Sequence, residues 1–154
     1  MSGEILKIFI AEAGSQAAAQ QAAEVEAGKG IVGDRYYRGD GTFSEKLAGN
    51  RKSEITFIAS EEIDHFNASQ NEALGYGEAR RNIVTKGLAL KQLIGQEFTI
   101  GSARFLGIEH CEPCYHLAST VNLKVLPHLA HTGLRAAILQ SGRIEVGDHV
   151  DAAD

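Results

Sequence analysis

Both cysteines of the chain lie in one short segment, His110-Cys111-Glu112-Pro113-Cys114-Tyr115-His116. Two of the six histidines are there as well, and Pro113 fixes the backbone just before Cys114. A thiolate is both a nucleophile and a soft metal ligand, and a helix starting after the proline would favour the thiolate form of Cys114. We therefore expect the chemistry of this protein at this segment.

Three kinds of chemistry fit these cysteines. A Cys-x-x-Cys pair between a strand and a helix is typical of a thioredoxin-type dithiol, but the βαβ wiring of that fold is missing from the sequence. A structural zinc ion would be held by Cys111, Cys114, His128 and His131, with a histidine spacing shorter than usual. A single reactive thiolate would carry sulfur as a persulfide or bind a heavy metal. The structural alternative is a pair of buried, unreactive thiols.

The composition narrows the class of protein and the partners it would have. The formal net charge is -5, which argues against nucleic acid and anionic membranes, because both attract positive surfaces. No apolar run approaches the roughly 20 residues of a membrane span, and residues 1–4 lack the pattern of a secretory signal. We expect a single domain over residues 1–154, located in the cytoplasm, where thiols stay reduced.

The remaining residues alternate mostly between short strands and turns. Strands are predicted over residues 4–10, 55–59, 80–85, 97–100, 103–108, 134–139 and 143–146, with a further short strand over 147–150. A helix is predicted after the expected cap Ser60, and a short one ending at Gly95. Residues 11–27 fit either a helix or a loop followed by a strand through Val25. Gly101-Ser102 predicts a tight hairpin. About eight short strands without sustained βαβ alternation favour a closed β-barrel with short helices over a doubly wound sheet.

Two stretches outside the cysteine segment contain candidate anion-binding residues. Residues 28–41 are rich in glycine, which permits close backbone approach, and Arg35 lies at the end of their Gly-Asp-Arg motif. Arg80 and Arg81 enter the strand predicted for 80–85. Because side chains alternate along a strand, Arg80 and Asn82 are predicted to share one face and Arg81 the other.

Several of these motifs together resemble the MOSC family, whose domains are similar to the C-terminal part of molybdenum cofactor sulfurase. They follow one another in order over nearly the whole chain: Gly30 to Tyr36, Arg80 to Gly95, Cys111 to Cys114, Gly133 to Ala136 and Gly142 to Asp148. The resemblance implies a closed, mixed β-barrel of the pyruvate-kinase barrel type.

The resemblance also implies roles for particular residues. Cys114 would be the essential cysteine, either ligating molybdenum in a pterin cofactor or carrying sulfane sulfur. Arg80 and Asn82 match an Arg-x-Asn pair that contacts the pterin phosphate, and Arg35 is a further basic contact. In reductive relatives the substrate is a small N-hydroxylated compound. This sequence shows no iron–sulfur or pyridoxal-phosphate domain, so a separate electron donor or sulfur donor would be needed. Cofactor chaperone or sulfur carrier is the alternative function.

Overall fold

The computed structural model describes residues 2–10, 18–34, 54–71, 73, 75–76, 81–110 and 133–152. These residues form eleven strands, one α-helix and one 3₁₀ helix. In chain order they are β1 (Ser2–Ile10), β2 (Ala18–Gln20), β3 (Ala22–Glu26), β4 (Gly30–Ile31), β5 (Ile55–Ala59), α3 (Ser60–Gln70), β6 (Ile83–Lys86), η3 (Leu90–Leu93), β7 (Glu97–Ile100), β8 (Ala103–His110), β9 (Gly133–Gln140), β10 (Gly142–Glu145) and β11 (His149–Ala152).

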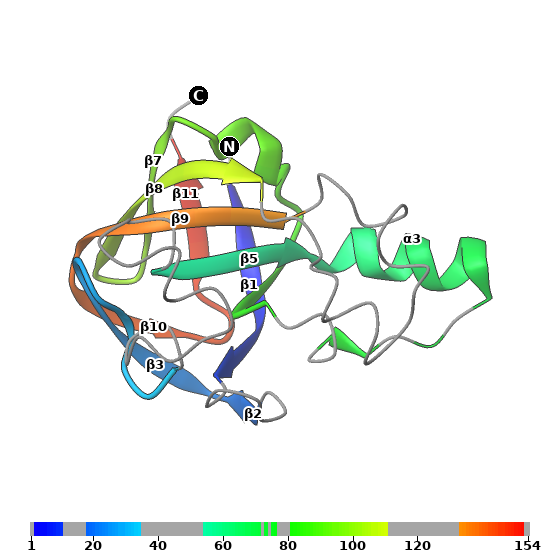
Figure 1. Ribbon diagram of the computed structural model, residues 1–154, viewed down its shortest axis with the longest axis horizontal. Coiled ribbons are helices and arrows are strands. Elements are labelled where there is room, and N and C mark those ends of the chain that lie inside the picture. The colour runs from blue at the N-terminus through cyan, green and yellow to red at the C-terminus, as the bar shows by residue number, and fades with distance from the viewer. Residues whose placement is uncertain are drawn as a thin grey trace, which may run out of the picture.

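A closed, mixed β-barrel forms the body of the described structure (Figure 1). Around the barrel the strands follow the order β1, β11, β7, β8, β9, β5 and β6, and β6 pairs with β1 to close it. The β5–β6 pair is parallel, whereas the other six pairs around the ring are antiparallel. The predicted mixed barrel is thus confirmed.

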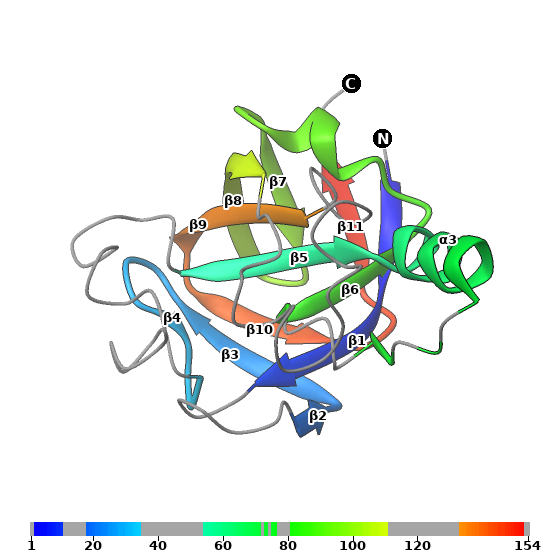
Figure 2. The ribbon, with the colours of Figure 1, turned by 45° about the vertical axis from the view of Figure 1, so that its right-hand side comes forward.

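A small second sheet extends the barrel and shares its core. It has the order β10, β3, β4 and lies at the lower left in Figure 2. One side chain from each of its strands, Val25, Ile31 and Ile144, belongs to the same buried cluster as the barrel interior. For residues 18–26 the structure confirms the strand through Val25, because β3 pairs with both β10 and β4.

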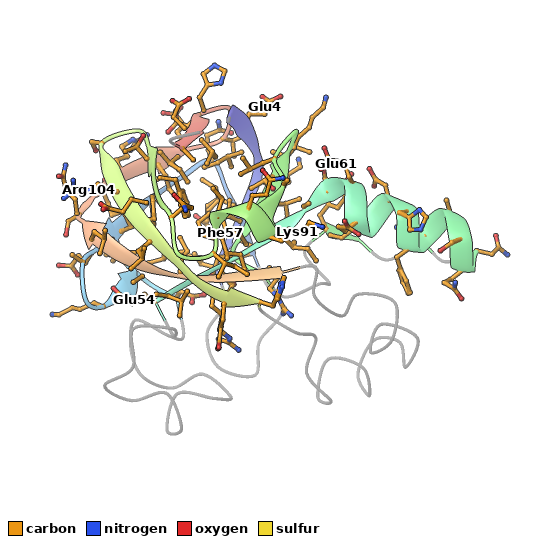
Figure 3. The ribbon with its side chains drawn as sticks, turned by 90° about the horizontal axis from the view of Figure 1, so that it is seen from above. Glu4, Glu54, Phe57, Glu61, Lys91 and Arg104 are labelled. Carbon is orange, nitrogen blue, oxygen red and sulfur yellow. The ribbon has the colours of Figure 1, made fainter. Side chains whose placement is uncertain are left out.

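Aromatic rings fill the barrel interior. Phe57 packs edge-on against Phe98 and Phe105, with ring centroids 5.6 and 6.0 Å apart, and the latter two rings stack on each other at 5.4 Å. Figure 3 shows Phe57 among the side chains inside the barrel, whereas Arg104 lies on its outside. Burying each ring stabilises the fold by about 1.5–3 kcal/mol.

The parallel β5–β6 pair is connected through α3, which gives the fold one βαβ unit. Helix α3 contacts both strands through a stripe that includes Ile63 and Phe66. The prediction that Ser60 caps this helix is wrong: Ala59 is at the N-cap, with no side-chain hydrogen bond, and Ser60 begins the helix. The Glu61 carboxylate instead accepts a hydrogen bond from the backbone N–H of Gly87, just after β6, at 2.7 Å.

Two glycines are required by close backbone approaches near β8. Gly101 starts the β7–β8 hairpin with a φ of 56°, as predicted. A Cβ on Gly107 would lie 2.0 Å from the carbonyl oxygen of Leu93, where η3 packs against β8.

No helix among the described residues has the length and apolar character needed to cross a bilayer.

Candidate functional site

Four polar side chains form a line across the outer face of the barrel wall made by β6, β5, β9 and β8. We call Asn82, Thr56, Arg135 and Glu109 the polar row. Arg135 on β9 is the register partner of Thr56 on β5 and of Glu109 on β8. Asn82, just before β6, is hydrogen-bonded to Thr56. The register thus gathers on one face residues that are far apart in sequence.

The Asn82 end of the row is a closed hydrogen-bond network. The Asn82 Oδ1 atom accepts hydrogen bonds from the backbone N–H and the hydroxyl of Thr56, both at 3.1 Å. In return, the Thr56 hydroxyl accepts from the backbone N–H of Asn82 at 3.0 Å. The Asn82 Nδ2 atom donates to the carbonyl oxygen of Phe9 at 3.2 Å. Since one Nδ2 hydrogen is used in this way, at most one N–H of the Asn82 side chain remains for a ligand.

Arg135 occupies the middle of the polar row. Its neighbours along β9, Leu134 and Ala136, point into the core, so its own side chain lies on the outer face. Arg135 is partly buried, and its Nη1 atom is buried without a hydrogen-bond partner among the described residues. A guanidinium in that position is costly to desolvate and is suited to binding an oxyanion.

Charged side chains are also buried beside the Asn82 end of the row. Arg81, which precedes Asn82, is only 8% exposed. Glu54, which precedes β5, is buried, and its carboxylate accepts a 2.6 Å hydrogen bond from the backbone N–H of Gly28. This bond ties the glycine-rich stretch to the start of β5, and Asp34 within that stretch is fully buried. Residues 28–34, which include β4, are therefore anchored to the strand that carries Thr56.

The residues predicted as site residues are covered unequally. Cys114, Cys111, Arg80, Arg35 and the proposed zinc ligands His128 and His131 lie outside the described residues. Within the described part of the chain, no three His, Cys, Asp or Glu side chains are close enough to hold a metal ion. The described strand β8 leads into the cysteine segment, because it ends at His110.

The predicted strand over residues 80–85 has the wrong start. β6 begins at Ile83, and Asn82 is at a bend. The alternation of side chains therefore does not apply at residues 81 and 82, and the common face of Arg80 and Asn82 stays a prediction because Arg80 lies outside the described residues. The cause is a tertiary contact: the Asn82 backbone N–H donates to the Thr56 hydroxyl, although the Asn82 carbonyl still accepts from the Phe9 N–H of β1.

Sequence reasoning gave no role to Thr56 or Arg135. The signal for Arg135 was present, because a charged residue interrupts the apolar strand Gly133–Gln140. The hydroxyl of Thr56 gave no such signal, since threonine is an ordinary residue in a strand. Only the strand register places both residues between Asn82 and Glu109.

Comparison with known proteins identifies relatives of this architecture. Residues 44–151 match the family model described as MOSC domain. A search of curated proteins gave no match. The YuaD protein from Bacillus subtilis is similar in structure, with a TM-score of 0.82 and 17% identity over 97% of this chain and 94% of its own.

Two proteins called YiiM also share the fold. The one from Geobacillus stearothermophilus has a TM-score of 0.75 and 17% identity, over 99% of this chain and 75% of its own. The one from Escherichia coli has a TM-score of 0.66 and 14% identity, over 100% of this chain and 70% of its own. At these identities the structures show a common fold, and the family follows from the sequence model: the chain belongs to the MOSC domain family.

Proposed function

We propose that this protein binds a molybdenum–pterin cofactor on the outer face of the barrel, with Cys114 as the metal ligand. The observation that carries the proposal is the polar row with Arg135 at its centre. Its Asn82 end follows the Arg-Arg motif, and its Glu109 end is one residue from His110, where the cysteine segment begins. Asn82 and Glu109, which adjoin these two motifs in sequence, thereby lie on one face.

The described residues suit an anionic, phosphate-bearing group. Arg81 supplies a guanidinium group, and such groups bind phosphate oxygens through parallel N–H donors. Asn82 holds Thr56 and Phe9 in place and offers at most one further N–H. We propose that Arg80 and Arg35 add further positive charge to the same phosphate.

The distance from the row to the thiol is limited by chain length alone. Four peptide units separate His110 from Cys114, so their Cα atoms are at most about 15 Å apart. When bound, the cofactor would supply a thiophilic metal able to transfer an oxygen atom, and the protein would supply position and charge. An N-hydroxylated small molecule would take up two electrons and two protons and yield the reduced amine and water. We propose that a separate protein delivers the electrons.

The deciding experiment measures what the protein carries. The chain is purified from a host that makes molybdenum cofactor, and molybdenum, pterin, zinc and cyanide-releasable sulfur are determined per chain. We expect molybdenum and pterin together. Labile sulfur without metal would instead support a persulfide carrier or cofactor chaperone, and stoichiometric zinc would support the structural metal site.

The two cysteines provide a matched pair of variants. We expect Cys114→Ser to lose the molybdenum and Cys111→Ser to keep most of it. Loss with Cys111→Ser and retention with Cys114→Ser would show that the other cysteine is the ligand. Retention of molybdenum in both variants would exclude a cysteine ligand.

A further inference from the structure

The Arg135 guanidinium has more donors than the described structure uses. The group carries five N–H bonds in a planar fork and has no acceptor. Its Nη1 atom is buried, with no hydrogen-bond partner among the described residues. Buried polar atoms in folded proteins are nearly always paired with protein or ordered water, so an anionic ligand would gain a charged hydrogen bond at this donor.

Neither neighbour in the polar row supplies that partner. On one side, the Thr56 hydroxyl donates to Asn82 Oδ1 and accepts from the Asn82 backbone N–H, so it is already engaged. On the other side, Glu109 is the register partner of Arg135 on β8, and Nη1 stays unpaired with that carboxylate in place. The Arg135 Nη1 donor, in the middle of the polar row, is therefore paired with neither of its neighbours in the row.

We propose that Arg135 binds an oxyanion of the ligand, a phosphate group being the chemistry that a guanidinium fork fits best. This inference rests on the proposed cofactor function. It adds a residue from the motif Gly133 to Ala136, to which the family resemblance assigned no role. Arg135 would hold the anionic end of the ligand. Thr56 and Asn82 are then positioning residues that keep the neighbouring strand rigid.

The test uses the full chain without cofactor, purified from a host unable to make it. Inorganic phosphate is the probe, at constant ionic strength set with sodium chloride, and binding is measured from the shift in Tm and by calorimetry. Arg135→Gln removes the charge, Arg135→Lys keeps it without the fork, and Arg104→Gln is the control. Arg104 is on β8, with half of its side chain exposed and 3.6 Å from Glu97.

We expect phosphate to raise the Tm of wild type and of Arg104→Gln. Arg135→Gln should bind phosphate about 10- to 100-fold more weakly, as for the loss of a charged hydrogen bond, with Arg135→Lys in between. Purified from a host that makes the cofactor, Arg135→Gln should retain several-fold less pterin than Arg104→Gln. Equal phosphate binding and equal pterin content in wild type and Arg135→Gln would overturn the inference.

Two further readouts keep the inference testable and separate from the proposed function. If Arg135→Gln does not fold, phenylglyoxal modification of the wild-type chain replaces it. Phosphate should protect Arg135 from modification and leave Arg104 reactive. Equal reaction at both residues in the presence of phosphate would overturn the inference. Phosphate binding that depends on Arg135, in a protein that never carries pterin or molybdenum, would support the anion site and contradict the cofactor. Pterin bound equally by wild type and Arg135→Gln would support the cofactor and contradict the anion site at Arg135.

Discussion

The two faces of the barrel wall formed by β5 and β9 contrast in chemistry although they belong to the same strands. Inward positions such as Ile55, Phe57 and Leu134 are fully buried and apolar. Outward positions carry the threonine and arginine of the polar row, and Thr56 is 1% exposed. Hydrophobic burial holds the inner face, whereas the outer face combines buried apolar residues, Ile58 and Ala137, with hydrogen bonding. Mutations on the two faces should therefore differ in size and even in sign.

The largest effect is expected on the inner face. Phe57→Ala removes a ring that packs against two others, so it should lower the free energy of unfolding by about 3–5 kcal/mol. Chemical denaturation measures this loss. The control is Val32→Ala, because Val32 is 46% exposed and should change stability by less than about 0.5 kcal/mol. A loss below that of Val32→Ala would mean that the ring cluster is not the core.

The next effect concerns a position without a side chain. Gly107→Ala would place a Cβ 2.0 Å from the Leu93 carbonyl oxygen, which is backbone and cannot rotate away. Overpacking of this kind should cost about 1–3 kcal/mol and loosen η3 from β8. Denaturation measures the cost, and faster amide exchange at Gly95, whose N–H donates to the Gly107 carbonyl at 2.8 Å, locates it. Wild-type stability would show that the η3–β8 contact is not close.

On the outer face, a polar truncation should cost nearly as much. Asn82→Ala leaves the Thr56 N–H and the Phe9 carbonyl without their buried partner, at about 2 kcal/mol. Thr56→Val should cost about 1 kcal/mol, and the double variant less than the sum, because each residue is a partner of the other. Denaturation of the three variants measures the coupling. Strict additivity would contradict the network.

The inner face could be predicted from the sequence, whereas the outer row could not. Strand 55–59 and the hairpin at Gly101-Ser102 follow from local patterns, namely β-branched residues and a glycine with positive φ. The barrel followed from the strand count and from the family resemblance. The strand and hairpin patterns are local, and the strand count and family motifs add up over the whole chain. An error at one residue therefore does not change the predicted barrel.

The row depends on register, which no local pattern specifies. Arg135 meets Thr56 and Glu109 only through pairing between strands that are distant in sequence. The start of β6 was wrong for a similar reason, because a tertiary hydrogen bond from the Asn82 N–H to Thr56 takes the place of a ladder bond. The predictions for Cys114, Arg80 and Arg35 lie outside the described residues and remain predictions.

Arg135 should give an effect of opposite sign. In the absence of cofactor and phosphate, Arg135→Met removes a buried cationic donor without a described partner and keeps most of the side-chain volume. We expect a gain of about 1 kcal/mol in the free energy of unfolding, because the desolvation cost of the guanidinium disappears. Denaturation of wild type and Arg135→Met, with and without phosphate, measures this change in the free energy of unfolding. A loss of stability without phosphate would indicate a structural ion pair and would weaken the contrast between the faces.

The smallest effect is expected away from both faces, at Tyr76. Its hydroxyl donates to the Asp64 carboxylate of α3 at 2.8 Å, and this hydrogen bond, followed by burial, raises the pKa of Tyr76 above its usual 10.0. Folding therefore favours the protonated phenol, so the contribution is complete below pH 10 and is lost as the pH rises through the raised pKa. Tyr76→Phe should lower stability by less than about 0.5 kcal/mol at neutral pH, as expected for a surface contact, and by nothing once the phenol is ionised. Denaturation of wild type and Tyr76→Phe from neutral to alkaline pH measures the difference in their free energies of unfolding. A loss from Tyr76→Phe that grows in alkali would contradict the Tyr76 hydroxyl as the donor.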